Sequence, residues 1–212
     1  MIVNTELENK GNQFPSKIID FKKDVDTLYF FTDNEVILQL TVVRDSVLRF
    51  RYTTVGNFDN DFSYAITKYA STGYNKLSIE DKKDKYVVTT SKLCCEISKE
   101  SLRISIFDAK DNTLINQDEI GFHWEESYQY GGNIVKMSKV SNDGESYYGL
   151  GDKPNHLNLK GKRYTNWATD SYAFGKDTDP IYKSIPFYTG LHHGKAYGVF
   201  FDNTFQSFFD FS

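Results

Sequence analysis

The chain has 212 residues, with 25 Lys and Arg against 29 Asp and Glu, so its formal net charge is −4. This mildly acidic balance gives no electrostatic reason to expect nucleic acid or an anionic membrane surface as a partner. Tyr and Phe are abundant, at 15 and 17 residues. Because aromatic residues favour strands, the composition indicates a β-rich protein that is long enough to bury a sizeable core.

The N-terminal segment and the cysteines bear on the compartment. Residues 1–14 lack a basic start followed by a long apolar core, so no signal peptide is predicted. No apolar run approaches the roughly 20 residues of a membrane span. Cys94 and Cys95 are adjacent in a predicted strand and therefore point to opposite faces, which indicates two reduced thiols. We expect a cytoplasmic protein without membrane contact, unless a leader has been removed.

Alternation of apolar and polar residues with a period of two dominates the chain and predicts strands. Residues 35–43 and 46–53 alternate most regularly, and Arg44-Asp45 between them is a natural hairpin turn. Residues 16–25 are the best helical candidate, although their apolar stripe is weak. Further strands are predicted at 27–31, 85–90, 92–98, 102–107, 113–116, 120–125, 134–140, 147–150, 186–191, 196–202 and 205–211. Many short strands joined by short turns indicate an all-β antiparallel sandwich, formed by a single domain over residues 1–212.

The pattern changes after Gly149. Residues 150–186 are rich in Gly, Asn, Asp, Lys and Tyr and show little alternation. A loop-rich segment of this length inside a compact domain is usually functional or disordered, and the aromatics, including Trp167, argue against disorder. Gly149 and Gly151 lack the surroundings of a phosphate-binding loop, so we expect them to allow a bend as the strand leaves its sheet.

The segment that follows carries a resemblance to a known family. Its pieces occur in order: Tyr-Gly-Leu-Gly at 148–151, Lys-Arg-Tyr at 162–164, Trp167 with Thr169-Asp170, Asp179-Pro180 with Tyr182, Ser184 to Phe187, and Gly198 to Thr204. Together they resemble glycoside hydrolase family 31, which contains α-glucosidases and α-xylosidases. Asp152 stands where many members have Glu, and Ala168 where many have Asn. Residues 1–146 fit the family's N-terminal β-sandwich by strand pattern alone.

The resemblance implies a galactose-mutarotase-like β-sandwich followed by a (β/α)8 barrel that holds two catalytic aspartates for retaining hydrolysis of α-glycosides. Alternating strand and helix patterns are absent here, so we expect the barrel downstream and predict that the 212-residue chain alone is inactive and holds no catalytic residue. The implied function is that of an accessory domain of an α-glycosidase, with an α-glucosidase as the expected type. Its expected partners are an α-linked oligosaccharide or glucoside and its own barrel, and no cofactor or metal is expected.

The resemblance also implies substrate-binding residues in the loop. Asp170 matches an aspartate that binds sugar hydroxyls, and a carboxylate is a strong acceptor for paired hydroxyl groups. From residue chemistry alone, the capping of a turn is the favoured role of Asp170, and the resemblance reverses this preference in favour of substrate binding. Trp167 either lines a sugar subsite or anchors the loop, and Tyr172 either extends an aromatic lining or packs within the loop.

Other residues and functions are weighed against these. Asp177 and Asp179 are interpreted as turn formers and not as a catalytic pair. His192 and His193 are expected to be solvated at a hairpin tip, because no third metal ligand is in reach. A stand-alone carbohydrate-binding module is the alternative function. A structural β-sandwich without ligand is a third possible function. Such a protein does not require the loop signature, so the presence of the signature counts against it.

Overall fold

The structure is a computed structural model that describes residues 11–67, 74, 76–127, 129 and 131–212. Residues 1–10, on which most of the signal-peptide argument rests, lie outside the described part. Every regular element of the described residues is a β-strand, and the strand pairs are antiparallel. None of the described residues forms a helix long and apolar enough to cross a membrane. The all-β antiparallel fold is thereby confirmed.

The chain divides into two compact units, Met1–Val140 and Ser141–Ser212. Each unit has its own cluster of buried apolar side chains. The single-domain organisation expected over residues 1–212 stays a prediction. The description below takes each unit by itself.

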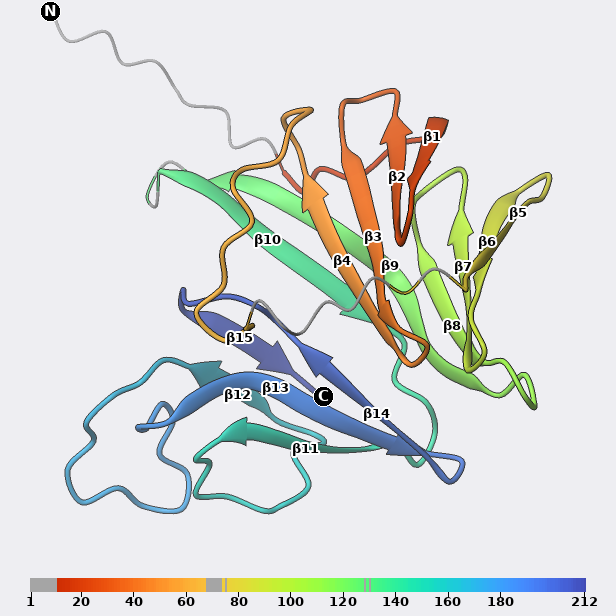
Figure 1. Ribbon diagram of the computed structural model, residues 1–212. Coiled ribbons are helices and arrows are strands. Elements are labelled where there is room, and N and C mark those ends of the chain that lie inside the picture. Colours follow the sequence, from red (N-terminus) through yellow and green to blue (C-terminus); the bar gives the residue numbers. More distant parts are fainter. Residues whose placement is uncertain (1–10, 68–73, 75, 128, 130) are drawn as a thin grey trace, which may run out of the picture. The chain divides into compact units, whose positions relative to one another are not determined.

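The first unit contains two sheets (Figure 1). A four-stranded sheet runs in the order β1-β2-β3-β4, with strands Ile18–Asp24, Thr27–Thr32, Ile37–Arg44 and Val47–Thr53. A six-stranded sheet runs in the order β10-β9-β8-β7-β6-β5; its strands, from β5 to β10, are Ser78–Asp81, Lys85–Thr89, Leu93–Ser98, Ile104–Asp108, Leu114–Ser127 and Gly132–Lys139. Sequential strands are neighbours within each sheet, as expected where short turns connect them.

The two sheets of the first unit share one apolar core, which makes this unit a sandwich. Leu38 and Leu40 of β3 are fully buried, and Cys95 and Ile97 of β7 are fully buried in the same cluster. Fully burying one such leucine or isoleucine contributes about 1.5–3 kcal/mol, so the inward-facing positions account for much of the stability. Cys94 is only half-buried, and both thiols are free, as their positions on opposite faces predict.

Three expectations for this unit are wrong. Residues 16–25 form no helix. Their weak apolar stripe does not stabilise one, and most of the segment forms β1, whose backbone hydrogen bonds are made with β2. The strands expected at 113–116 and 120–125 are one strand, β9, which continues through Gly121 at a positive φ of 81°. The hairpin between β3 and β4 turns at Asp45-Ser46, one residue later than predicted.

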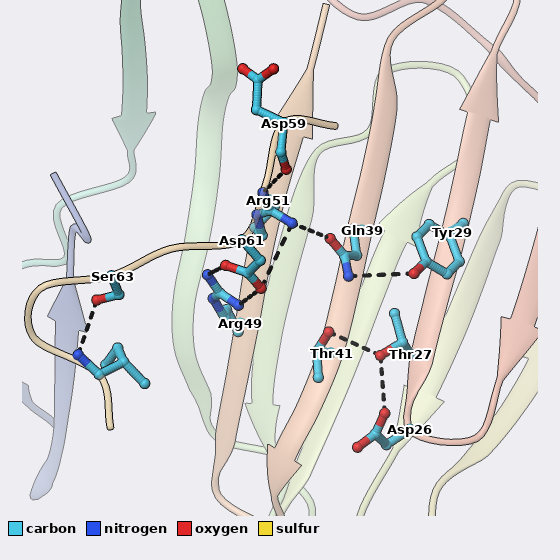
Figure 2. A network of polar contacts seen from close by, with 11 residues as sticks. Asp26, Thr27, Tyr29, Gln39, Thr41, Arg49, Arg51, Asp59, Asp61 and Ser63 are labelled. Atoms are coloured by element: carbon cyan, nitrogen blue, oxygen red, sulfur yellow. Dashed lines mark hydrogen bonds and ion pairs between the residues drawn. The ribbon is translucent and has the colours of Figure 1, made fainter. Parts of the chain in front are cut away.

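The polar face of the four-stranded sheet carries a ladder of hydrogen bonds, which Figure 2 shows. Arg51 donates to Gln39 Oε1 at 3.1 Å and to the carbonyl oxygen of Asp59 at 3.2 Å. Arg49 binds the Asp61 carboxylate through two parallel bonds of 2.6 and 2.7 Å. The alternating arginines of β4 therefore hold the segment after β4 against the sheet.

Replacing Asp61 with asparagine is expected to lower the free energy of unfolding by only about 0.5–1 kcal/mol, because the Arg49 and Asp61 side chains are 34% and 47% exposed and solvent screens the pair. The hydrogen bond from Arg49 lowers the pKa of Asp61, so its contribution is present above the unfolded pKa of about 3.9 and is lost as the pH falls. Denaturant unfolding in low and high salt measures the effect. Asp59→Asn is the control, since only the Asp59 carbonyl oxygen joins the ladder; an equal loss in both variants would contradict the assignment.

The second unit contains a three-stranded sheet, β11-β13-β14, with strands Ser146–Gly151, Ser184–His192 and Lys195–Phe200. A two-stranded sheet pairs β12, Arg163–Asn166, with β15, Ser207–Asp210. The core of this unit is largely aromatic: Tyr147 stacks on Phe211 with ring centroids 4.6 Å apart, and Tyr188 meets Phe211 edge to face at 5.3 Å. β12 lies inside the segment predicted to be loop-rich, and its four residues are too few for their alternation to predict a strand.

Candidate functional site: the loop after β12

The candidate site begins where β11 leaves its sheet. Gly149, Leu150 and Gly151 all have positive φ, at 129°, 65° and 82°, and the pairing with β13 shifts register between the two glycines. A Cβ on Gly151 would lie 1.8 Å from the carbonyl oxygen of Lys183. Positive φ and close backbone approach therefore both require glycine here. The bend predicted from the two glycines is present as a bulge at the end of β11.

The three predicted substrate-binding residues lie in the loop that joins β12 to β13, residues 167–183 (Figure 1). Trp167 is 49% exposed, Tyr172 is 98% exposed and Asp170 is exposed. Aromatic side chains usually bury their large apolar area, so a loop that presents two of them to solvent is a candidate for ligand contact.

The turn around Asp170 is closed by its neighbours. The Thr169 hydroxyl donates to the carbonyl oxygen of Trp167 at 3.1 Å, and the amide of Ser171 donates to the carbonyl oxygen of Thr169 at 3.0 Å. Within the described part of the chain, no hydrogen bond or ion pair is found for the Asp170 carboxylate. The geometry therefore gives no support to Asp170 as a turn cap, and it leaves the carboxylate available to an external donor.

A second exposed aromatic pair lies further along the same loop. Phe174 and Tyr182 meet edge to face with ring centroids 5.9 Å apart, and they are 44% and 40% exposed. Tyr182 belongs to the family motif quoted from the sequence, whereas Phe174 lies outside it. The contact shows that the outgoing and returning arms of the loop touch through aromatic rings.

Asp177 and Asp179 bind lysines instead of acting simply as turn formers. Asp177 accepts from Lys162 Nζ at 3.1 Å and from Asn155 Nδ2 at 2.8 Å, and the bond from Lys162 lowers the pKa of Asp177. Asp179 accepts from Lys153 Nζ at 2.9 Å. Both carboxylates therefore tie the loop to residues that precede β12.

These ion pairs border a small cavity. Its volume is about 130 Å³, and its walls include Lys153, Asn155, Tyr164 and Lys176. Pockets that enclose small molecules usually measure about 300–1,000 Å³. This cavity is too small to enclose a sugar, and its walls do not include Trp167 or Tyr172. A sugar bound at these exposed aromatics would therefore need a further wall.

Of the two histidines, one is exposed as expected and the other is buried. His193 is exposed, as predicted for a hairpin tip, but His192 is buried, with its Nε2 atom 4.0 Å from Glu145 Oε1. Glu145 is itself buried, and nothing in the sequence around it indicated this. No group of three or more His, Cys, Asp or Glu able to hold a metal ion is found among the residues that the structure describes.

The fold and the loop define a class of protein: an all-β, galactose mutarotase-like chain whose described residues contain no (β/α)8 barrel. The family model for the glycosyl hydrolase 31 N-terminal galactose mutarotase-like domain matches residues 37–210, and the chain belongs to this family. The resemblance stated from the motifs of residues 147–211 is thereby confirmed.

Individual relatives agree with this assignment. The chain is 27% identical over 176 residues to Alpha-glucosidase 2 of Bacillus thermoamyloliquefaciens, covering 82% of this chain and 22% of the relative. It is 38% identical over 79 residues to an alpha-glucosidase of Saccharolobus solfataricus, covering 37% of this chain and 11% of the relative. A glycoside hydrolase family 31 dextranase from Flavobacterium johnsoniae, solved with isomaltotriose, superposes with a TM-score of 0.82 at 28% identity, covering 94% of this chain and 24% of the dextranase. The chain thus spans only a quarter or less of the length of these relatives.

Proposed function

We propose that this chain is the N-terminal accessory domain of a retaining α-glycosidase that acts on α-linked glucosides, and that its loop forms one wall of the substrate pocket of a catalytic barrel. Asp170 accepts hydrogen bonds from sugar hydroxyls, while Trp167 and Tyr172 offer aromatic faces to the ring. The matched relatives include two alpha-glucosidases and a dextranase, all of which are several times longer than this chain.

One observation carries the proposal. The Asp170 carboxylate is exposed and has no partner among the described residues, beside a tryptophan and a tyrosine that are also exposed. The Asp170 side chain therefore contributes little to the stability of the domain itself. It suits a ligand whose hydroxyl groups donate to the carboxylate, since hydrogen bonds to a charged acceptor are the stronger kind.

Asp170→Asn is expected to lower kcat/KM for an α-glucoside in the polypeptide that carries both this chain and the barrel. A lost hydrogen bond between substrate and a charged group costs about 1.5–3 kcal/mol, which is roughly a 10–150-fold loss. The melting temperature is expected to stay nearly unchanged, because Asp170 supports no contact within the domain.

The matched control is Asp177→Asn, which changes another exposed carboxylate of the same loop and is expected to keep kcat/KM within about twofold. Unchanged kinetics for Asp170→Asn, or a large fall in its stability, would return Asp170 to a purely structural role.

The alternative of a stand-alone carbohydrate-binding module is favoured by the exposed aromatics and is separable by calorimetry. The 212-residue chain titrated with isomaltose or maltose is expected to show no binding heat, since its loop supplies one wall only. Saturable heat that is lost in Trp167→Ala would establish the binding module instead.

A further inference from the structure

We propose that Lys153 and Asp179 form a clamp that fixes β12, the strand that directly precedes the Trp167–Asp170 segment. By fixing this strand, the clamp positions Asp170 for substrate. The kinetic consequence rests on the proposed function above, whereas the clamp itself stands on contacts within the second unit. The two residues are positioning residues, since neither is assigned a contact with the sugar.

The clamp acts on one peptide of β12. β12 pairs with β15 on one side only, and Thr165 lies opposite Phe208 in this pairing. Lys153 Nζ donates to the carbonyl oxygen of Thr165 at 2.7 Å, and the amide of Thr165 donates to Asp179 Oδ2. In an antiparallel strand the N–H and C=O of one residue point to the same side. The lysine and the aspartate therefore serve the open edge of β12 as a third strand would.

The clamp is closed on itself, and its lysine is shielded from water. Lys153 Nζ also donates to Asp179 Oδ1 at 2.9 Å, so each charged group binds both the other and Thr165. The Lys153 side chain is only 3% exposed and the Asp179 side chain 23% exposed. Because Lys153 is buried, solvent screens this pair less than a fully exposed one, and loss of Asp179 leaves the buried lysine charge without its counter-ion.

The same segment holds the other side of Asp170. Pro180 follows Asp179 directly, and its carbonyl oxygen accepts from the Ser171 hydroxyl at 3.0 Å. Asp170 therefore lies between Thr165, which binds Asp179, and Ser171, which binds Pro180. Because both ends of the Asp170 segment are tied to residues 179–180, movement of Asp179 shifts the carboxylate of Asp170.

A neighbouring contact supplies a matched control. Asp177, in the same loop as Asp179, binds Lys162 at 3.1 Å, but these side chains are 75% and 44% exposed. The two pairs have the same chemistry and differ in burial and in their hold on β12. Asp177→Asn should therefore leave the Thr165 peptide unaffected.

The clamp is tested by amide hydrogen exchange on the 212-residue chain. Asp179→Asn and Lys153→Met are each expected to speed exchange of the Thr165 amide by about tenfold or more, while Asp177→Asn leaves its rate unchanged. Protection of the Tyr147 and Tyr188 amides reports whether each variant keeps the core of the second unit. Equal Thr165 exchange in wild type and in a variant with that core intact would overturn the clamp.

The positioning role is tested in the polypeptide with the barrel. Asp179→Asn is expected to lower kcat/KM by about 10–100-fold, as a displaced binding group does. Combined with Asp170→Asn, it should add less than about threefold, because both changes remove the same substrate contact. Fully multiplicative losses would overturn the link to Asp170 without touching the clamp. A loss in Asp179→Asn together with unchanged kinetics in Asp170→Asn would instead reject the proposed role of Asp170.

Discussion

Replacing Glu145 with alanine is expected to lower the free energy of unfolding of the second unit by about 3–5 kcal/mol. The Glu145 side chain has no exposed area. Its carboxylate accepts from the Tyr197 hydroxyl at 2.5 Å, from the Asn142 amide at 2.8 Å and from Asn142 Nδ2 at 3.0 Å. Truncation to alanine leaves these donors unpaired in a shielded place and opens a cavity, and both effects destabilise the unit.

The same carboxylate is expected to give the unit an acid-sensitive stability. Burial alone raises the pKa of Glu145, but the hydrogen bonds from Tyr197 and Asn142 together outweigh it and leave the pKa lowered. A folded pKa below the unfolded value of about 4.3 means that the stabilisation is present above this pH and is lost as the pH falls through the folded pKa.

Glu145→Gln is the matched control, because it keeps the shape and an acceptor for Tyr197 but removes the charge. Denaturant unfolding between pH 3 and pH 7 is expected to show a smaller loss than in the alanine variant and a flatter dependence on pH below about pH 4.3. If the free energy of unfolding has the same pH dependence in the wild type and in Glu145→Gln over this range, Glu145 is not an ionised, hydrogen-bonded carboxylate.

Replacing Gly151 with alanine is expected to destabilise the second unit by about 3 kcal/mol. The left-handed backbone, at φ 82°, costs an L-residue about 1–2 kcal/mol. The added Cβ also meets the Lys183 carbonyl oxygen at 1.8 Å, so that β11 and β13 must separate, and such overpacking costs about 1–3 kcal/mol more.

Gly161→Ala separates the two contributions. Gly161 has nearly the same φ, 81°, but nothing lies within 4 Å of its added Cβ. It is therefore expected to show the backbone cost alone, about 1–2 kcal/mol. Urea unfolding, with exchange of the β11 and β13 amides as the local readout, measures both variants. Equal destabilisation would show that the close approach of Lys183 contributes nothing.

The strands of the first unit were largely predictable because local alternation and global burial agree there. Leu38 and Leu40 alternate with polar residues in the sequence and are fully buried in the structure. Arg49 and Arg51 occupy the intervening positions of the next strand and bind polar groups on the opposite face. The period of two is a property of the strand itself, so it can be recognised without knowing the partner strands.

The candidate site was predictable only in part. The family motif indicated Trp167, Asp170 and Tyr172, and their roles toward substrate stay predictions. Few apolar residues alternate in the loop-rich segment of residues 150–186, so patterning did not indicate what holds it. The ties of Asp177 and Asp179 to lysines are a feature that apolar patterning does not reveal.

Residue identity and spacing alone were sufficient for the all-β class, the free cysteines, the bend at Gly149 and Gly151, and the family. Only the tertiary structure decided that Glu145 and His192 are buried together and that Lys153 and Asp179 close on one peptide of β12. The physical reason is the separation along the chain over which each interaction acts. Strand alternation and turn preference act between neighbours along the chain, whereas the burial of a charge and its choice of partner depend on segments that meet only when the chain has folded.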